Sequence, residues 1–285
     1  MIQYTKQFGL DDDDLRAFEP VYRPGLLKGQ VAIVSGAGTG IGRGIAAIFA
    51  KLGATLVICG RNEERLTEAA EFLREFGNPV DAVPMSIREP EAVEQLMDHT
   101  FETHGRLDHV INNAGGQFAM DAIDISYNGW KAVIDTNLNG TWYMMQNAAQ
   151  RWRDRGEPGN IITITAVTES GIRQMAHTVA SRAGVNHLTK TLAVEWAPHQ
   201  IRINTVAPGV IASSGFNNYP PEHVEQFEKA SPMRRCGEVT DVAQACVYLC
   251  AESGNYVTGQ TLVVAGGMEI YGGIWPAGKP AWYDD

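Results

Sequence analysis

The chain alternates between short apolar runs and longer amphipathic segments over most of its length. An apolar, β-branched run at 31–34 leads into apolar residues at helical spacing over 45–50, and a second such run follows at 55–59. This pattern predicts strands near 30–35, 54–59, 80–85, 107–112, 160–165, 201–206 and 260–264, and helices near 41–52, 62–76, 89–104, 127–153, 174–197 and 239–251. Strands joined by crossover helices are typical of a parallel sheet with helices on both faces. We therefore expect a Rossmann-type, doubly wound α/β fold with a seven-stranded sheet.

No linker, internal repeat or low-complexity tract divides this alternation, which indicates a single domain. We expect an N-terminal arm over 1–29, the domain over 30–270 and a C-terminal tail over 271–285. The arm carries an acidic run at 11–14 and is expected to be irregular, either solvated or used at an interface. The segment near 209–238 contains Pro220 and Pro221 and little strand pattern. Segments of that length in a domain are often lids, so we predict a substrate lid there.

The composition is that of a folded, acidic protein. With 285 residues, of which 44% are hydrophobic, the chain can bury a sizeable core. Its formal net charge of −10 argues against nucleic acid or an anionic membrane as the main partner, because both carry negative charge. No apolar run reaches the length of a membrane span, and the acidic start is unlike a secretory signal. These features favour a cytoplasmic protein.

The cysteines and histidines do not follow a metal-binding pattern. The four cysteines lack the paired spacing of a zinc site, and the seven histidines show no cluster of the HExxH type. Cys246 and Cys250 are one helical turn apart in a predicted helix, where burial as small hydrophobic residues is the favoured interpretation. No metal is predicted.

A glycine-rich loop joins the first predicted strand to the first predicted helix. Its sequence is Ser35-Gly36-Ala37-Gly38-Thr39-Gly40-Ile41-Gly42. Glycines let the backbone turn tightly and approach a pyrophosphate, whose charge is favoured by free N–H groups and the dipole at the start of a helix. Because the loop lies between a strand and a helix, and another strand follows, it predicts a dinucleotide site rather than an unliganded turn.

The end of the second predicted strand indicates which dinucleotide is bound. NAD enzymes commonly place a carboxylate there for the ribose 2′-hydroxyl, but this chain has Gly60-Arg61-Asn62. A guanidinium suits a 2′-phosphate, so the sequence favours NADP(H) over NAD(H). The alternative is that Arg61 only pairs with Glu64 on the surface of the following helix.

Several motifs together resemble the short-chain dehydrogenase/reductase family over about 30–270. They are the glycine loop, Asn112-Asn113-Ala114-Gly115, Asn137-Leu138-Asn139-Gly140-Thr141 and Ile203-Asn204-Thr205-Val206-Ala207-Pro208-Gly209. The resemblance implies cofactor contacts with Ser35, Gly36, Gly38, Thr39, Gly40, Ile41, Gly42, Arg61, Asn62, Ser86, Ile87, Asn113, Ala114, Gly115, Arg182, Pro208, Gly209 and Ile211. In that family a serine binds the substrate oxygen and a tyrosine transfers the proton. A lysine four residues later lowers the tyrosine pKa and holds the nicotinamide ribose, and an asparagine supports a water of the proton relay.

Three of those four catalytic positions are changed in this chain. Thr178 is at the tyrosine position, Arg182 at the lysine position and Ala166, preceded by Thr165, at the serine position, whereas Asn137 is retained. Threonine lacks the acidity of a phenol, and arginine does not titrate near neutrality. The usual acid and base for alcohol–ketone interconversion are therefore absent, while Arg182 keeps a role at the ribose hydroxyls.

One branch of the family is similar to the chain at these altered positions. The segments 24–34 and 112–118 and the run His177-Thr178-Val179-Ala180-Ser181-Arg182-Ala183-Gly184-Val185 resemble peroxisomal trans-2-enoyl-CoA reductase and, less closely, the 2,4-dienoyl-CoA reductases. Those enzymes use NADPH to reduce a C=C bond conjugated to a thioester. Hydride goes to the β-carbon and an enolate forms on the thioester oxygen, where one donor contributes about 10²–10³ in rate. The resemblance implies that Thr178, Thr165 or His177 is that donor.

The resemblance leaves the source of the α-carbon proton open. The enoyl reductase has a tyrosine, regarded as its proton donor, where this chain has Asn186, and water is the other candidate. Structural interpretations of the catalytic candidates also stay open. In these interpretations, the ring nitrogens of His177 bond to backbone groups and take no part in chemistry. Thr178 only fills the space that a tyrosine would occupy, and the side-chain amide of Asn137 bonds to the backbone and holds its helix in place.

Three functions follow from these observations. The first is an NADPH-dependent reductase of the C=C bond in a 2-enoyl-CoA or similar conjugated acyl substrate. The second is a dehydrogenase of a terpenoid or steroid-like alcohol or aldehyde, against which the missing tyrosine and lysine count. The third is a cofactor-binding protein without catalysis.

The resemblance also bears on assembly and location. It implies a homotetramer with the helices at 127–153 and 174–197 at its interface. The ending Trp282-Tyr283-Asp284-Asp285 differs from a peroxisomal signal of the SKL kind, which again favours the cytoplasm.

Overall fold

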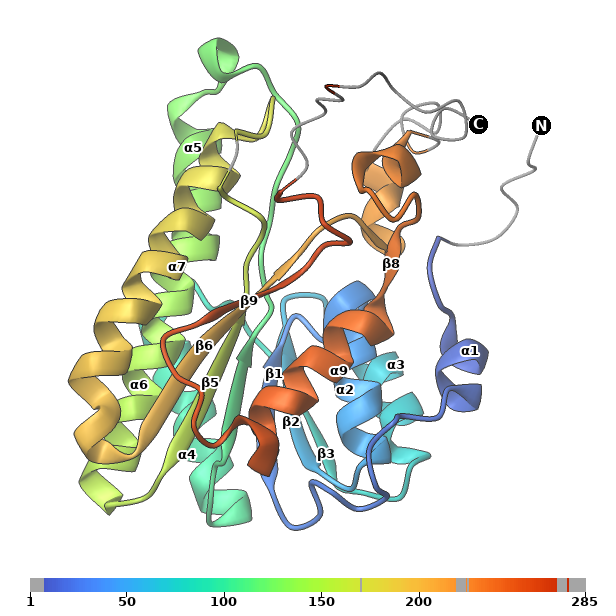
Figure 1. The fold of residues 1–285 in the computed structure, drawn as a ribbon. Coiled ribbons are helices and arrows are strands. Elements are labelled where there is room, and N and C mark those ends of the chain that lie inside the picture. Colours follow the sequence, from blue (N-terminus) through green and yellow to red (C-terminus); the bar gives the residue numbers. More distant parts are fainter. Residues whose placement is uncertain (1–7, 170, 219–223, 225, 271–275, 277–285) are drawn as a thin grey trace.

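In the part of the chain that the structure describes, seven parallel strands form a central sheet with helices on both faces (Figure 1). The structure is a computed structural model and describes residues 8–169, 171–218, 224, 226–270 and 276. The strands are β1 (Val31–Ser35), β2 (Thr55–Gly60), β3 (Val80–Pro84), β4 (His109–Asn112), β5 (Gly159–Ile164), β6 (Ile201–Pro208) and β9 (Thr261–Val264), in the spatial order β3-β2-β1-β4-β5-β6-β9. The strand order reverses between β1 and β4, and folds of this kind bind ligands outside the carboxyl ends of the strands at that point.

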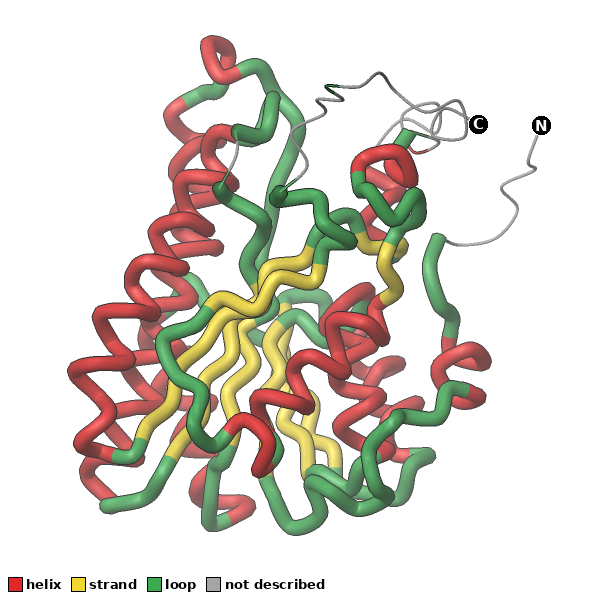
Figure 2. The backbone as a smooth tube through the Cα atoms, in the orientation of Figure 1, coloured by secondary structure: helices red, strands yellow, loops and turns green. Residues whose placement is uncertain are grey.

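Two layers of helices cover the sheet, as the tube in Figure 2 also shows. One layer contains α2 (Gly40–Lys51), α3 (Glu63–Arg74) and α9 (Val239–Cys250), and the other contains α4 (Pro90–His104), α6 (Thr141–Arg155) and α7 (Ala176–Trp196). Alternate residues of β1 serve the two layers: Ala32 and Val34 pack in the first, and Ile33 packs in the second. Burial from both sides explains why the strand patterns are continuous apolar runs, and the predicted doubly wound fold is confirmed.

The predicted helix at 127–153 contains an interruption. It consists of α5 (Tyr127–Ile134), a π-helical segment (Asp135–Gly140) and α6. The hydrophobic pattern does not reveal this change, because the chain continues along a helical path. Asn137 lies within the π-helical segment, and the hydroxyl of Thr141 donates to its carbonyl oxygen at 2.9 Å. Such turns are frequent at functional sites.

The described part of the N-terminal arm contains a helix, α1 (Asp12–Ala17), so the expectation of an irregular segment is wrong there. The Asp11 carboxylate accepts the Asp14 N–H at 2.9 Å, and the Asp14 carboxylate accepts the Asp11 N–H at 3.1 Å. The acidic run therefore supplies a reciprocal helix cap. Leu15 and Leu27 are buried in the same core cluster as α2.

Two short strands join the ends of the segment predicted to be a lid. β7 (Ile211–Ala212) pairs in parallel with β8 (Gly237–Glu238), and short 3-10 turns cover 214–218 and 227–230. Residues 219–223 and 225 of this segment lie outside the described residues, and so does the predicted C-terminal tail except for Pro276. The lid stays a prediction.

His109 is buried at the start of β4 among partners that fit a neutral ring. Its Nε2 lies 2.7 Å from Oε1 of Gln30, and its Nδ1 lies 3.3 Å from Nδ2 of Asn160. A carbonyl acceptor on one side and an amide donor on the other place the single proton on Nε2. Burial lowers the pKa of His109 to about 4.

We expect the free energy of unfolding to fall by about 2 kcal/mol between pH 7 and pH 5 because of His109. In the unfolded chain the ring binds a proton below about pH 6.5, whereas in the folded protein it binds one only near its lowered pKa of about 4. Urea unfolding at the two pH values measures the loss. The loss should shrink in His109→Gln and persist in the control His199→Gln, whose ring is exposed. An undiminished loss in His109→Gln would contradict the neutral assignment.

Candidate active site

The glycine loop lies between β1 and α2 with little space around it. Gly36 has a φ of +69°, and a Cβ there would lie 2.9 Å from the Cα of Ala114. A Cβ on Gly42 would lie 2.4 Å from Nδ2 of Asn113. Glycine is thus required where the loop after β4 packs on this turn. Thr39 is the N-cap of α2 and makes no side-chain capping bond, which leaves first-turn N–H groups for a ligand.

Ser35 and Asn113 hold these two loops together. Ser35 Oγ donates to the carbonyl of Ile111 at 3.3 Å and accepts the backbone N–H groups of Asn113 and Ala114, both at 3.1 Å. The Asn113 side-chain amide donates to the carbonyls of Ser35 at 3.0 Å and Gly36 at 3.3 Å. Because the Ser35 side chain is fully buried and bonded within the protein, its contribution to a cofactor site is to fix the loop.

Arg61 and Asn62 lie just beyond the carboxyl end of β2. Asn62 caps α3, since its Oδ1 accepts the N–H of Arg65 at 2.8 Å. Arg61 and Glu64 are both exposed, and among the described residues no ion pair joins them. The surface pairing considered as an alternative for Arg61 is therefore not formed.

The other predicted cofactor residues lie at the same edge of the sheet, at the carboxyl ends of β3 and β6. Ser86 and Ile87 follow β3, and Ile87 is buried. Pro208 ends β6, the N–H of Gly209 donates to the carbonyl of Val264 at 3.0 Å, and Ile211 is buried in β7. The predicted cofactor residues are thus brought together from strands far apart in the sequence.

Ser213 and Ser214 are two residues of this edge that the sequence analysis missed. A Cβ on Gly40 would lie 3.5 Å from Oγ of Ser214 and 3.9 Å from Oγ of Ser213. Both hydroxyls therefore lie beside the start of α2. The sequence feature that could have indicated them is their position shortly after Pro208, where the chain leaves the carboxyl end of β6.

Arg182 and Asn137 enclose the loop that follows β4. A Cβ on Gly115 would lie 2.2 Å from Nη2 of Arg182 and 3.1 Å from Oδ1 of Asn137. Oδ1 of Asn137 accepts the N–H of Gly116 at 2.9 Å, and Nδ2 donates to the carbonyl of Gly116 at 3.0 Å and to Oγ of Ser181 at 3.3 Å. Asn137 is fully buried, so these contacts are those of a residue that positions the loop.

Arg182 is a buried cation with an unused donor. Its residue is 8% exposed, and Nη1 has no hydrogen-bond partner in the described part of the chain. Burial lowers the pKa of Arg182 to about 10, which leaves the group charged at neutral pH. A buried donor without an acceptor costs about 1–3 kcal/mol. Ribose hydroxyls are acceptors that remove this cost, so the residues around Gly115 fit a dinucleotide.

His177 and Thr178 lie in the first turn of α7. Nδ1 of His177 accepts the N–H of Thr178 at 2.8 Å, and Oγ1 of Thr178 lies 3.2 Å from the same nitrogen. Since Nδ1 is the acceptor, the hydrogen-bond pattern assigns the ring proton to Nε2. Nε2 is buried without a partner among the described residues, and burial lowers the pKa of His177. The ring of Phe118 contacts His177 edge-on, with centroids 4.3 Å apart.

The three predicted donors differ in whether their donor group already has a hydrogen-bond acceptor within the protein. Thr165 follows β5, and its hydroxyl donates to the carbonyl of Val206 at 3.4 Å. The hydroxyl of Thr178 is within hydrogen-bond reach of Nδ1 of His177. Of these three side chains, His177 is the one whose buried N–H is unused.

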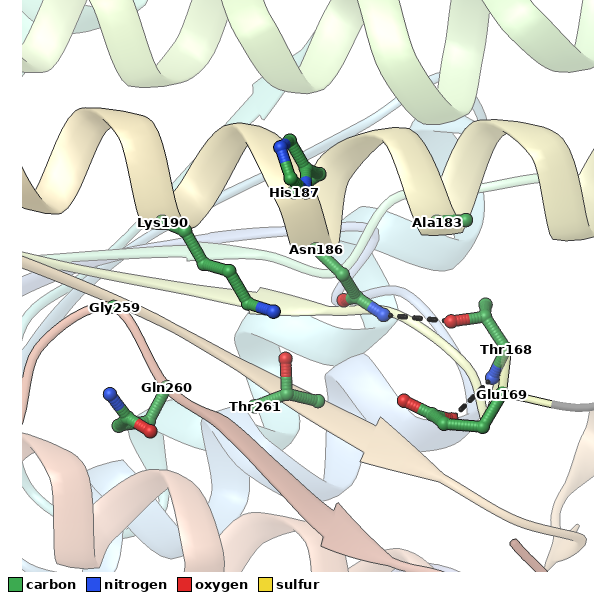
Figure 3. A pocket seen from close by; sticks show the side chains of 9 residues that line it. All are labelled: Thr168, Glu169, Ala183, Asn186, His187, Lys190, Gly259, Gln260 and Thr261. Carbon is green, nitrogen blue, oxygen red and sulfur yellow. Dashed lines mark hydrogen bonds between the residues drawn. The ribbon is translucent and has the colours of Figure 1, made fainter.

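A cavity of about 390 Å³ lies between α7, the loop after β5 and the start of β9 (Figure 3). Asn186 and Lys190 project from α7 toward Thr261, which faces them from β9. Nδ2 of Asn186 donates to Oγ1 of Thr168 at 3.1 Å. Amide, ammonium, hydroxyl and carboxylate groups line this cavity, so its lining is too polar to suit an apolar acyl chain.

The described residues contain no metal-binding cluster and no membrane-spanning helix. No group of three or more histidine, cysteine or carboxylate side chains is arranged to hold a metal within the described ranges. Cys59, Cys246 and Cys250 are buried, and burial raises the pKa of each thiol. None of the helices described is both long and apolar enough to cross a membrane.

Comparisons with known proteins agree with this geometry. A family model described as "Enoyl-(Acyl carrier protein) reductase" matches residues 36–269. The chain is 35% identical over 264 residues to peroxisomal 2,4-dienoyl-CoA reductase of Danio rerio, with 90% of this chain and 87% of the relative covered. It is 34% identical over 251 residues to a probable 2,4-dienoyl-CoA reductase of Bacillus subtilis, with 85% and 97% covered.

A solved structure is also similar to this chain. The citronellol catabolism dehydrogenase (AtuB) of Pseudomonas aeruginosa PAO1 matches with a TM-score of 0.79 at 33% identity, and the match covers 88% of this chain and 100% of that one. The predicted family is confirmed, and so is the resemblance to its 2,4-dienoyl-CoA reductases. The protein is an oxidoreductase and belongs to the short-chain dehydrogenase/reductase family.

Proposed function

We propose that the protein is an NADPH-dependent reductase of a C=C bond conjugated to an acyl thioester, with 2-enoyl-CoA or 2,4-dienoyl-CoA esters as substrates. The observation that carries the proposal is the buried Nε2 of His177, which has no hydrogen-bond partner among the described residues, at a site that lacks the tyrosine of alcohol dehydrogenases. Reduction of a conjugated C=C bond needs a donor to the thioester oxygen rather than an acid on a carbinol oxygen. Relatives named 2,4-dienoyl-CoA reductase support this class of substrate.

Each residue of the site has its own role in this reaction. The bound nicotinamide supplies the hydride. The Nε2–H of His177 donates to the thioester oxygen as negative charge develops there, and the ring stays neutral because burial lowers its pKa. Arg182 binds the ribose hydroxyls through Nη1, and Asn137 holds the loop at Gly115 against it. We assign the α-carbon proton to water, because the amide of Asn186 is not an acid.

The proposed test is the oxidation of NADPH, and separately of NADH, followed by absorbance with a panel of acyl-CoA esters. The panel contains 2-enoyl-CoA esters of rising chain length, 2,4-dienoyl-CoA and simple ketones. Turnover of the conjugated esters, and none of the ketones, is the expected result. Turnover of the ketones alone would contradict the proposal.

The proposed cofactor is NADP(H), and Arg61 is the residue that selects it. We expect Arg61→Asp to raise the Kd for NADPH by about tenfold to 100-fold, since a charge-assisted bond to the 2′-phosphate is replaced by repulsion. The Kd for NADH should fall, because a carboxylate binds the ribose 2′-hydroxyl. Fluorescence titration with both nucleotides measures the change, with Glu64→Gln as the control. An unchanged ratio of the two Kd values would mean that Arg61 does not contact the phosphate.

A second candidate function is the dehydrogenation of a terpenoid alcohol or aldehyde. The likeness to a citronellol catabolism dehydrogenase favours it. The threonine and arginine at the tyrosine and lysine positions count against it, because neither side chain transfers a proton to and from a carbinol oxygen near neutral pH. The third function, binding without catalysis, is set aside because the chain belongs to a family of oxidoreductases.

The proposed assembly is a homotetramer with α5, α6 and α7 at the interface. Apolar side chains support it, since Ile123, Tyr127 and Trp130 near α5 and Val194 on α7 are exposed in a single chain. Light scattering of the purified protein measures the mass, and a monomer would contradict the assembly. The cytoplasmic location stays a prediction.

A further inference from the structure

A cavity of about 510 Å³ lies beside the glycine loop, and the N-terminal segment forms one of its walls. Gly38, Thr39 and Gly40 line it from the glycine loop, and Ser213 and Ser214 line it from the turn after β7. The wall from the N-terminal segment consists of Phe8, Leu10, Asp11, Asp12, Asp13, Leu15 and Arg16. We call residues 8–16 the N-terminal strap.

The strap contacts the glycine loop through an ion pair. Nη2 of Arg43 donates to Oδ2 of Asp12 at 2.7 Å, and Nη1 donates to the carbonyl of Gly38 at 3.3 Å. The guanidinium also lies 5.1 Å from the centre of the Phe72 ring, and its side chain is only 16% exposed. A peptide unit is planar, so fixing the Gly38 carbonyl also fixes the direction of the Thr39 N–H. Asp12 therefore acts on the glycine loop through Arg43.

The strap contacts the opposite wall of the cavity through Gly9. Gly9 has a φ of +82°, and a Cβ there would lie 2.5 Å from the carbonyl oxygen of Ala212 and 2.8 Å from the Cα of Ser213. Any side chain at Gly9 has to move the strap away from this turn. The backbone of the strap is thus packed directly on the residues that precede Ser214.

Aromatic rings extend this second contact. The rings of Phe8 and Phe216 have centroids 5.6 Å apart, and those of Phe216 and Phe227 are 5.1 Å apart in an edge-to-face arrangement. Phe216 is buried. The strap therefore contacts the turn at 214–218 directly and is connected through Phe216 to the turn at 227–230.

The acidic run of the strap is neutralised or bonded within the protein. Asp11 and Asp14 cap each other's backbone, Asp12 pairs with Arg43, and Asp13 pairs with Arg16 at 2.6 Å. The four carboxylates thus have hydrogen-bond or ion-pair partners within the protein, and Arg16 also pairs with Glu75 at 2.7 Å.

We propose that the N-terminal strap is part of the cofactor-binding site and holds the glycine loop and the Ser213–Ser214 turn at the spacing that a dinucleotide requires. Asp12 and Gly9 are positioning residues in this arrangement, because neither is assigned a contact with the cofactor. The inference rests on the proposed binding of a dinucleotide at the glycine loop, and it is independent of the proposed acyl substrate.

The first test compares two glycine substitutions at positive φ. Gly9→Ala should raise the Kd for NADPH by about tenfold. The matched control is Gly29→Ala, since Gly29 has a φ of +80° but no atom within 4 Å of an added Cβ. The control carries the same backbone strain without the clash, so its Kd should stay within about twofold of the unchanged protein. Fluorescence titration with NADPH measures both, and thermal unfolding without nucleotide shows that each variant is folded.

A second pair of variants carries the test without added strain. Asp12→Asn removes the charge that holds Arg43, and Asp98→Asn removes a comparable aspartate–arginine pair with Arg151, at 2.6 Å, far from the glycine loop in the sequence. The Kd for NADPH should rise about threefold to tenfold in Asp12→Asn and stay unchanged in Asp98→Asn. This pair decides the outcome if Gly9→Ala fails to fold.

Hydrogen exchange distinguishes this proposal from a purely structural role, because NADPH would not change amide exchange in a strap that only stabilises the fold. Binding is reciprocal, so if the strap favours NADPH, NADPH must favour the ordered strap. NADPH should slow amide exchange in a peptide that covers 8–16. Equal Kd values in both pairs of variants, or unchanged exchange in that peptide while NADPH binds tightly, would overturn the proposal. If the unchanged protein binds neither NADPH nor NADH, the proposed dinucleotide function itself fails, and the strap proposal fails with it.

Discussion

Replacing Arg182 by methionine is expected to weaken NADPH binding about 100-fold and, at the same time, to raise the unfolding temperature of the protein without nucleotide. The binding loss follows because Nη1 is the buried donor that fits a ribose hydroxyl. The gain in stability follows because an apolar side chain replaces a buried cation whose Nη1 has no partner among the described residues. Nucleotide titration and thermal unfolding measure the two effects separately.

Arg202→Met is the matched control for this prediction. Arg202 also has a pKa lowered by burial, but its Nη1 donates to the carbonyls of Leu249 and Gly254, both at 2.9 Å. Its replacement removes the guanidinium donor from both carbonyls, so we expect lower stability and unchanged NADPH affinity. An Arg182→Met variant that binds NADPH as tightly as the unchanged protein would remove the cofactor role of Arg182.

Replacing His177 by asparagine is expected to lower kcat about 10²–10³-fold, whereas replacing it by glutamine should retain most of the rate. The amide nitrogen of glutamine reaches the position of Nε2, which is the unused donor, but the shorter asparagine reaches only the position of Nδ1. The Kd for NADPH should be the same in both variants, because His177 is not assigned to the cofactor. Steady-state turnover of a conjugated acyl-CoA measures the effect.

The hydroxyl groups give a control within the same site. Thr178→Val and Thr165→Val should each lower kcat less than His177→Asn, because both hydroxyls have acceptors within the protein. If Thr178→Val has the largest effect of the three, the oxyanion donor is the hydroxyl and not the imidazole.

Burial lowers the pKa of His177, so the rate that depends on its neutral ring should persist as the pH falls to about 6.5.

The central strands of the sheet could be predicted from the sequence because they are buried on both faces. β1 is buried at every position, and its apolar run is visible without a structure. The helix α1 could not be predicted from the same signal, because a capping box between Asp11 and Asp14 starts it within a run of charged residues. The π-helical segment was also hidden, since it changes the hydrogen-bond pattern without breaking the helical path.

The sequence predicts the candidate site as a set of residues but not as a set of contacts. The sequence named Thr165, Thr178 and His177 as equal candidates for the oxyanion donor. What distinguishes the three candidates is whether a hydrogen-bond acceptor lies near each donor group. The acceptor of the Thr165 hydroxyl is the carbonyl of Val206, 41 residues away along the chain. Likewise, the role of Asn137 depends on the backbone of Gly116, which a linear pattern does not place beside it.

The π-helical segment between α5 and α6 has a consequence for how this site changes in evolution. Its hydrogen bonds span one residue more than those of an α-helix, so it acts as a one-residue insertion. Each residue turns an α-helix by about 100°. The side chains of α5 are therefore rotated about the helix axis by about 100° relative to the directions that an unbroken α-helix would give them. α6 buries Trp152 in the core, while α5, which lies beside α7, exposes Tyr127. Loss or gain of a single codon in this segment would rotate the side chains of α5 past the end of α7 that carries His177 and leave the packing of α6 intact.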